Sequence, residues 1–111
     1  MNKGCELSRD GDWAVLKVWG EVDLSWSQDV RRQVLDAFAK VRALAVQLDA
    51  VSYIDSSGIA ALVEGFQHAR GKGGRFALLA PSEPVRAVLE LARLDRVFPI
   101  FADLAAARSA E

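Results

Sequence analysis

The 111-residue sequence predicts one α/β domain, in which an N-terminal β-hairpin leads into alternating helices and strands. A chain of this length can bury roughly two thirds of its unfolded surface, so it needs no metal or disulfide to hold a core. A turn signal between two apolar runs predicts the hairpin, and the later change of apolar period from two to about 3.6 predicts the helices. We therefore expect a mixed sheet of four to five strands with about four helices, in which parallel crossovers adjoin an antiparallel edge.

The first two strands and the first helix follow from turn chemistry and periodicity. Residues Cys5 to Val18 form two apolar runs around Asp10-Gly11-Asp12, and an Asp-Gly pair between such runs favours a hairpin. The next segment has a helical period, which predicts a helix from about Trp26 to Lys40. Ser25 is a good N-cap and Gln28 follows three residues later, so we expect a capping box at the start of this helix. Its apolar stripe consists of Val30, Val34, Phe38 and Val41.

The middle of the chain predicts a buried strand, a second helix and another strand. Ala43 to Leu48 (ALAVQL) is mostly apolar and too short for a lone helix, so we expect a buried strand. The next apolar stripe predicts a helix that ends at the glycines between Gly71 and Gly74. Arg75 to Leu79 (RFALL) is the following strand. The helical stripe, which we expect to pack on the sheet, consists of Ile59, Leu62, Val63 and Phe66.

The C-terminal third predicts a third helix, a short strand and a terminal helix. Ser82, with Pro84 in the first turn, begins a helix that runs to about Ala92. Val97 to Phe101 predicts a last short strand before an alanine-rich helix. We expect the last residues, Ala105 to Glu111, to fray.

Composition and charge exclude several classes of function. Fourteen basic residues against fifteen acidic ones give a net charge of -1, with no run of like charges to follow a nucleic-acid backbone, so we expect no direct nucleic-acid binding. Cys5 is the only cysteine, which fits a reducing compartment. The N-terminus lacks the apolar core of a signal peptide, and no apolar run approaches the roughly 20 residues that span a bilayer. We expect a cytoplasmic protein that does not insert into a membrane.

One stretch concentrates polar groups at a predicted strand end. VSYIDSSGIAALVEGF, from Val51 to Phe66, places an acid, two hydroxyls and a glycine between a strand-like run and a helix-like run. Turns at the carboxyl ends of strands are where α/β sheets commonly place their sites. The stretch could therefore hold a nucleophile, a phosphate-binding loop, a phosphorylation site or an ordinary helix cap. The candidate residues are Asp55, Ser56, Ser57 and Gly58.

The sequence argues against a serine nucleophile at this site. Such a serine needs a base within hydrogen-bond reach, and the chain holds one histidine, His68. His68 lies eleven residues after Ser57 on the same predicted helix, a separation of about 16 Å. The G-x-S-x-G pattern of a nucleophile elbow is also missing. We assign no catalytic residue, and we expect His68 to lie at the surface or rim of its helix.

Phosphate-loop and metal chemistry are not favoured either. A P-loop places its glycines after a strand and before a helix, because backbone N–H groups and the helix N-terminus must face the anion together. The glycines from Gly71 to Gly74 have the reverse order and fit a helix end followed by a tight turn. No cluster of histidine, cysteine and carboxylate has ligand spacing. The sequence therefore indicates neither a cofactor nor a metal.

Capping and phosphorylation remain as alternatives for the two serines. An Asp or Ser at the N-cap satisfies free helix N–H groups and contributes about 1 kcal/mol, which explains one residue of the motif. A second hydroxyl near the positive end of the helix is well placed to carry a phosphate. The residues alone leave both interpretations open.

Two segments resemble a known family. LDAVSYIDSSGIAALV, from Leu48 to Val63, is similar to the signature of the STAS domain, specifically the bacterial anti-sigma factor antagonists, with D-S-S-G-[LI] opening a helix. GEVDLS, from Gly20 to Ser25, resembles that family's G-E-[LIV]-D segment between the hairpin and the first helix. The likeness runs from about Leu7 to Ala106. It implies a single STAS domain over residues 1–111, with a core over about 5–107.

The resemblance implies a regulatory switch rather than an enzyme. In these antagonists the second serine of D-S-S-G, here Ser57, is phosphorylated by a partner anti-sigma factor that is itself a serine kinase. The unphosphorylated antagonist binds the anti-sigma factor and frees the sigma factor, so transcription is regulated by partner switching. The phosphorylated form dissociates, and a PP2C-type phosphatase restores it.

The resemblance also assigns a surface that faces the partner. Asp55, Ser56 and Gly58 surround Ser57, and Asp23 matches the acid of the G-E-[LIV]-D segment in the same neighbourhood. We expect Gly58 to keep the approach to Ser57 open, so that a valine there would leave the fold intact and reduce phosphorylation.

The three tryptophans allow different interpretations. Trp26 stands where the family often has a small or polar residue, and it is either an exposed anchor for the partner or a hydrophobic contact with the sheet edge. We include it in the partner-binding set on the first alternative. Trp13 and Trp19 lie in predicted strands and are expected in the core or on a sheet face.

Other functions occur among proteins with this domain. Some resemble the soluble subunit of a phospholipid-trafficking ABC transporter, in which the position of Ser57 is often not a serine. A stressosome scaffold is a third alternative, although such proteins usually carry another domain. The sequence leaves open the identity of the anti-sigma and sigma factors, the signal and the oligomeric state, for which a dimer is one alternative.

Overall fold

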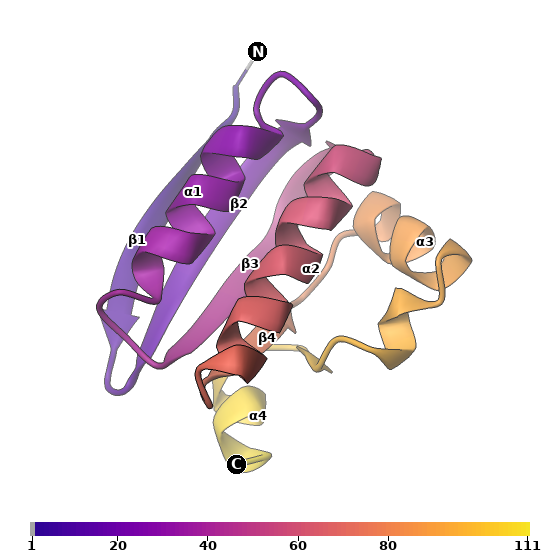
Figure 1. Ribbon diagram of the computed structural model, residues 1–111. Helices are drawn as coiled ribbons and strands as arrows, with labels where there is room; N and C mark the ends of the chain where they lie inside the picture. The colour runs from indigo at the N-terminus through magenta and orange to yellow at the C-terminus, as the bar shows by residue number, and fades with distance from the viewer. Residues whose placement is uncertain (1) are drawn as a thin grey trace.

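The computed structural model describes residues 2–111 and contains one mixed five-stranded sheet with the strand order β1-β2-β3-β4-β5 (Figure 1). β1 pairs with β2 in antiparallel fashion, and the other neighbours are parallel. The predicted α/β fold with an antiparallel edge is confirmed. The strands are β1 (Gly4–Asp10), β2 (Trp13–Val22), β3 (Ala43–Ile54), β4 (Arg75–Leu79) and β5 (Ile100–Phe101).

Four α-helices cover the sheet. Two of them lie side by side across one face, and the last helix lies under the other face near the C-terminus (Figure 1). A short 3-10 helix, Leu94–Arg96, follows the third helix. The α-helices are α1 (Ser27–Ala37), α2 (Ser56–Gly71), α3 (Glu83–Leu91) and α4 (Leu104–Ser109).

The hairpin turn lies where the sequence predicts it. Asp10 pairs with Trp13, so Gly11 and Asp12 form the loop between β1 and β2. Gly11 has φ +65, a left-handed conformation that glycine adopts without steric cost. The local Asp-Gly signal therefore determines the position of this turn.

The start of α1 differs from the prediction. The helix begins at Ser27, and its N-cap residue is Trp26, which makes no side-chain cap hydrogen bond. Ser25 forms no capping box, because its N–H and its hydroxyl both donate to the Asp23 carboxylate. The Asp23 carbonyl instead accepts the N–H groups of Trp26 and Ser27, at 3.0 and 2.8 Å.

β3 is twice as long as predicted. The apolar run predicts a strand over Ala43–Leu48, whereas β3 continues to Ile54. The added residues pair with the distal half of β2, as far as Val22 opposite Ile54. Residues 43–48 are almost all buried, whereas among the added residues only Val51 and Ile54 are buried. Two register shifts interrupt the β2–β3 ladder in this distal half.

The C-terminal elements follow the predicted order with shifted bounds. Helix α3 begins after Ser82, but the Ser82 hydroxyl donates to the Val51 carbonyl at 2.6 Å and does not cap the helix. β5 is limited to Ile100–Phe101, shorter than predicted. At the C-terminal end, α4 runs to Ser109, and the Glu111 carboxylate accepts the Trp13 indole N–H at 2.9 Å.

Two apolar clusters stabilise the sheet from opposite faces. The larger lies between the sheet and α1, α2 and α3, and the smaller lies beneath α4. Trp13 is in the smaller cluster, and Trp19 is half-buried on the sheet beside Gly4. Trp26 is only 9% exposed and belongs to the larger cluster, so it cannot be the exposed anchor that one interpretation required.

None of the helices formed by residues 2–111 has the length and apolar character needed to cross a membrane. Across the same residues, no three His, Cys, Asp or Glu side chains gather closely enough to hold a metal ion.

Candidate functional site

The two segments singled out in the sequence meet at one edge of the sheet. β2 and β3 are parallel neighbours, and Val22 pairs with Ile54, so Asp23 and Asp55 leave the sheet side by side. The Asp55 N–H donates to the Val22 carbonyl at 3.3 Å and joins the two segments. Figure 1 shows the loop before α1 next to the first turn of α2. The carboxyl ends of these strands thus form the candidate site.

Asp55 organises the first turn of α2. It is the N-cap residue, with an extended backbone, and one carboxylate oxygen accepts the N–H groups of Ser57 and Gly58 at 2.9 and 3.2 Å. The same oxygen accepts the Ser57 hydroxyl at 2.6 Å. The sequence left helix capping and phosphorylation open as alternatives, and Asp55 is relevant to both. Its carboxylate caps the helix, and it also holds the hydroxyl of Ser57, the candidate phosphorylation site, in one orientation.

The loop before α1 repeats this arrangement. One Asp23 oxygen accepts the Ser25 N–H at 3.0 Å and the Ser25 hydroxyl at 2.5 Å. The Lys3 ammonium lies 3.5 Å from the Ser25 hydroxyl oxygen and 5.7 Å from the centre of the Trp26 ring. The sequence analysis did not include Ser25 in the site, although the repeated Asp-x-Ser spacing was a signal for it.

Both carboxylates are stabilised in their charged form. The Ser57 hydroxyl, the principal cause, lowers the pKa of Asp55 against partial burial, with help from the N–H groups of Gly58, Ser57 and Leu24. The Ser25 hydroxyl likewise lowers the pKa of Asp23, and Lys3 adds to this effect, while the charge of Asp55 opposes it. The site therefore carries two neighbouring negative charges at neutral pH.

Exposed apolar side chains accompany these charges. Leu24, in the loop after Asp23, is 73% exposed, and Tyr53, near the end of β3, is 48% exposed. Ser56 is exposed, whereas Asp23, Asp55 and Ser57 are half-buried. Leu24 and Tyr53 were not predicted as site residues, because an apolar side chain in a strand or loop gives no local sign of its exposure. An acidic surface with apolar side chains at its border is suited to binding another protein.

Gly58 has a different role from the one expected. Its backbone is buried, and a Cβ at this position would lie 2.7 Å from Ile54 Cγ1 and 2.9 Å from Val22 Cγ1. Those side chains belong to the core. Gly58 therefore lets the first turn of α2 approach the sheet, and a valine there would disturb the fold, contrary to the expectation that the fold would stay intact.

His68 does not take part in the site. Helix α2 is continuous from Ser56 to Gly71, so His68 lies three turns beyond Ser57, about 16 Å along the helix axis. Its ring is half-buried against the Phe38 ring, with 5.4 Å between the ring centres. The group that accepts the Ser57 hydroxyl proton in a hydrogen bond is Asp55.

Comparisons with known proteins show what this chain is similar to. The sequence model of the STAS domain matches residues 5–107. The anti-sigma F factor antagonist of Paenibacillus polymyxa is 25% identical over 103 residues, which cover 91% of this chain and 88% of that protein.

Solved structures show the same fold. An anti-sigma factor antagonist from Mycobacterium paratuberculosis superposes with a TM-score of 0.87 at 24% identity, covering 98% of this chain and 93% of that one. The Bacillus cell fate determinant SpoIIAA, in its phosphorylated form, superposes with a TM-score of 0.74 at 21% identity, covering 97% of this chain and all of that one.

Proposed function

The chain belongs to the STAS domain family, and from that premise we propose that it is an anti-sigma factor antagonist controlled by phosphorylation of Ser57. In its unphosphorylated form it binds an anti-sigma factor that has serine kinase activity. That kinase phosphorylates Ser57 and the complex separates, and a PP2C-type phosphatase returns the antagonist to its binding form. The protein acts as a substrate and a binding partner, not as an enzyme, and works in the cytoplasm.

The observation that carries the proposal is the hydrogen bond from the Ser57 hydroxyl to Asp55, at 2.6 Å, in the first turn of α2. The bond holds the oxygen in one orientation at a partly exposed helix start. A kinase that transfers a phosphoryl group to this oxygen must remove its proton, and Asp55 is already the acceptor for that proton. Ser56, one residue earlier, has no such acceptor among its hydrogen bonds within residues 2–111.

Phosphorylation would change this site in two ways. The Ser57 oxygen would lose the proton it donates to Asp55, and a group of about -1.5 to -2 charges would stand beside that carboxylate. The N–H groups of Ser57 and Gly58 already donate to Asp55, so the phosphate would have to compete for them. In a closely packed interface the phosphate would also be partly desolvated. Each 1.4 kcal/mol lost in this way weakens binding about tenfold.

The surface around Ser57 supports a protein partner. Leu24 directly follows Asp23, Tyr53 lies two residues before Asp55, and both apolar side chains are exposed. A partner suited to this surface presents apolar side chains with basic groups nearby. The proposed partner-binding surface comprises Asp23, Leu24, Tyr53, Asp55, Ser56 and Ser57.

The test is purification of the tagged full chain from its native cells, followed by mass spectrometry of its companions. The proposal predicts a protein with a histidine-kinase-like ATPase domain among them. When that partner is purified and incubated with ATP and the antagonist, the phosphate should be found on Ser57. Recovery of ABC transporter subunits alone would overturn the proposal in favour of an assembly subunit.

A further inference from the structure

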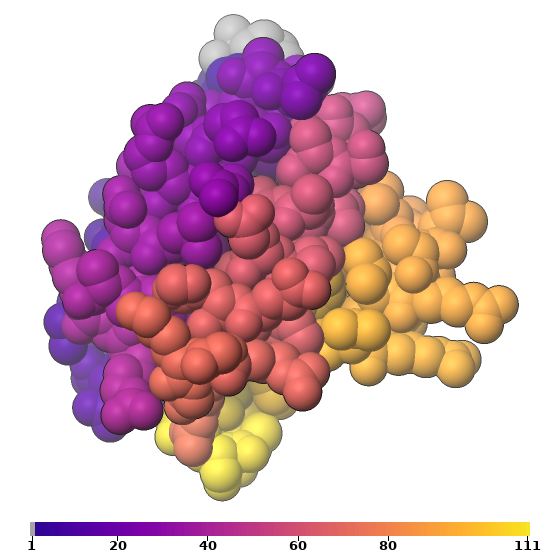
Figure 2. Space-filling model, viewed as in Figure 1, coloured from indigo at the N-terminus to yellow at the C-terminus, as the bar shows by residue number. Residues whose placement is uncertain are grey.

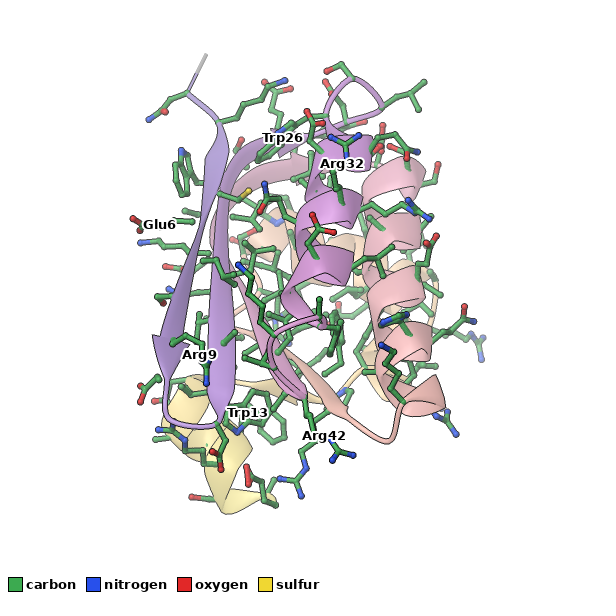
Figure 3. All side chains as sticks on the ribbon, turned by 60° about the vertical axis from the view of Figure 1, so that its left-hand side comes forward. Glu6, Arg9, Trp13, Trp26, Arg32 and Arg42 are labelled. Atoms are coloured by element: carbon green, nitrogen blue, oxygen red, sulfur yellow. The ribbon has the colours of Figure 1, made fainter. Side chains whose placement is uncertain are left out.

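A cavity of about 330 Å³ lies at the opposite edge of the sheet from Ser57, between α4, the end of α2 and the start of β4. Most of its wall is apolar, and four aromatic side chains contribute to it: Trp13, Phe66, Phe76 and Phe101. Figure 3 shows Trp13 at the hairpin end of the sheet beside the terminal helix. Phe66, Ala69 and Arg70 of α2 line the cavity, and they follow Ser57 by 9 to 13 residues, so the cavity lies about 14–20 Å from Ser57 along the helix axis.

The cavity exists because β5 is short. β5 pairs only with Leu78 and Leu79, so the outer edge of β4 from Arg75 to Ala77 has no neighbouring strand. Residues of α2 and of α4 line the space at this edge, and the lower part of Figure 2 shows the end of α2 next to the yellow C-terminal helix. The small side chains of Ala69 and Ala107 line the space and leave it open.

The last turn of α4 and the residue at the C-terminus are tied to the hairpin and to β4. One Glu111 oxygen accepts the Trp13 indole N–H at 2.9 Å, and the other lies 2.6 Å from the Arg75 guanidinium. Arg108 pairs with Asp10 of the hairpin turn. These contacts hold the wall in place, so the cavity is formed before any ligand enters.

A cation without an acidic partner stands at the cavity. Two arginines line it, and Arg75 is paired with Glu111. Arg70 takes part in none of the ion pairs present between residues 2 and 111. Its guanidinium lies 5.7 Å from the centre of the Phe66 ring, so the charge is next to the aromatic wall.

We propose that this cavity binds a small aromatic carboxylate, with the aryl group among the four rings and the carboxylate on Arg70. Aromatic rings attract one another edge to face, so an aryl ligand gains more here than an aliphatic one of equal area. Arginine binds carboxylates through two parallel hydrogen bonds. The volume is at the lower end of the range of about 300–1,000 Å³ for small-molecule sites, which favours a ligand of one or two rings.

The test is a titration of the ¹⁵N-labelled full chain with 2-naphthoate, followed by heteronuclear NMR. The indole N–H resonance of Trp13 should move and saturate, while those of Trp19 and Trp26 stay in place. 2-Naphthalenemethanol, which lacks the charge, and cyclohexanecarboxylate, which lacks the aromatic ring, should each bind at least about tenfold more weakly. A stationary Trp13 resonance, or equal binding of either comparison compound, overturns the proposal.

Two pairs of variants locate the ligand. Ala110→Leu, just after the end of α4, places a larger side chain at the cavity wall and should weaken binding, whereas Ala105→Leu, on α4 but outside the wall, should not. Arg70→Gln should weaken binding at least about tenfold, and Arg86→Gln, on exposed α3 surface, should have no effect. Wild-type affinity in Ala110→Leu or in Arg70→Gln would refute the assigned position. Because Ser57 is remote, this result is independent of the proposed phosphorylation.

Discussion

Gly58 and Ile54, four residues apart, are in direct contact where β3 turns into α2, and no side chain fits between them. Ile54 is 4% exposed and belongs to the main core, so it has little room to move. The contact fixes how closely the first turn of α2 approaches the sheet. It therefore also fixes where Asp55 and Ser57 lie relative to the end of β2.

Gly58→Ala should destabilise the fold. The added Cβ would lie 2.7 Å from Ile54 Cγ1, and overpacking of this kind costs about 1–3 kcal/mol. The free energy of unfolding, measured by urea titration, should fall by that amount. The free energy of unfolding of Gly58→Val should fall further, because two more methyl groups enter the same space.

Gly71→Ala is the matched control for this prediction. Gly71 ends the same helix, and nothing lies within 4 Å of a Cβ built there. Alanine should be neutral or stabilising by up to about 1 kcal/mol, since it restricts the unfolded chain. Equal changes in the free energy of unfolding for the two variants would mean that helix propensity, rather than the contact with Ile54, determines the effect of alanine at position 58.

Variants of Ser57 should separate binding from phosphorylation. Ser57→Ala should bind the anti-sigma kinase and accept no phosphate. Ser57→Asp should bind more weakly, because it adds a charge beside Asp55, although one charge is less than a phosphate carries. Calorimetry with the purified partner gives the affinities, and a phosphate-dependent gel shift after incubation with ATP gives the modification.

Ser56→Ala serves as the control for the Ser57 variants. The Ser56 side chain is exposed and does not share the hydrogen bond to Asp55, so this variant should be phosphorylated normally. If both Ser57 variants bind like wild type and ATP causes no shift in the wild-type protein, phosphorylation does not control the complex. An assembly subunit would then be the better description.

The charge of Asp55 should make stability depend on pH in the acid range. Folding lowers the pKa of Asp55, so its contribution is complete above the ordinary value of about 3.9 and is lost as the pH falls through the lower folded value. Wild type should therefore be more stable than Asp55→Asn at pH 6, and the difference should shrink below about pH 4. Asp23 stands nearby and titrates in both proteins.

Urea titrations of the two proteins between pH 6 and pH 2 provide the measurement. Asp36→Asn is the control, because Asp36 is exposed on α1 and its carboxylate makes no hydrogen bond or ion pair within residues 2–111. It should leave the pH dependence unchanged. A constant difference between wild type and Asp55→Asn across this range would show that the charge of Asp55 does not stabilise the helix start.

Phe66→Ala should lower the free energy of unfolding less than the same substitution of a fully buried phenylalanine would. Phe66 contacts Phe76 and Phe98 edge to face, with ring centres 6.3 and 5.5 Å apart, yet it is only half-buried. We expect the free energy of unfolding to fall by roughly 2–3 kcal/mol, which is less than the roughly 3–5 kcal/mol lost when a fully buried ring is removed. Leu62→Ala, at a 1% exposed position on the same stripe, should lose about 2–5 kcal/mol. A loss below about 1 kcal/mol for Phe66→Ala would contradict its place in the aromatic cluster.

Local chemistry in the sequence was sufficient for the turns and for most elements. The Asp10-Gly11-Asp12 turn, the strand Arg75–Leu79 and the helix after Asp55 appear where the sequence predicts them. Each depends on groups within about four residues: a glycine that accepts a positive φ, an apolar run between glycines and serine, and a carboxylate that reaches the next N–H groups. Such interactions can be predicted without knowing how the rest of the chain folds.

Interactions between distant segments decided the remainder. β3 extends to Ile54 because β2, some thirty residues earlier, offers a partner strand of that length. Trp26 is buried because the loop folds onto the sheet, and Gly58 is required by core side chains of β2 and β3. Burial and close approach depend on which surfaces meet in space. A local pattern can therefore place Ser57 at a helix start, but only tertiary packing brings Asp23 beside it and opens the cavity under α4.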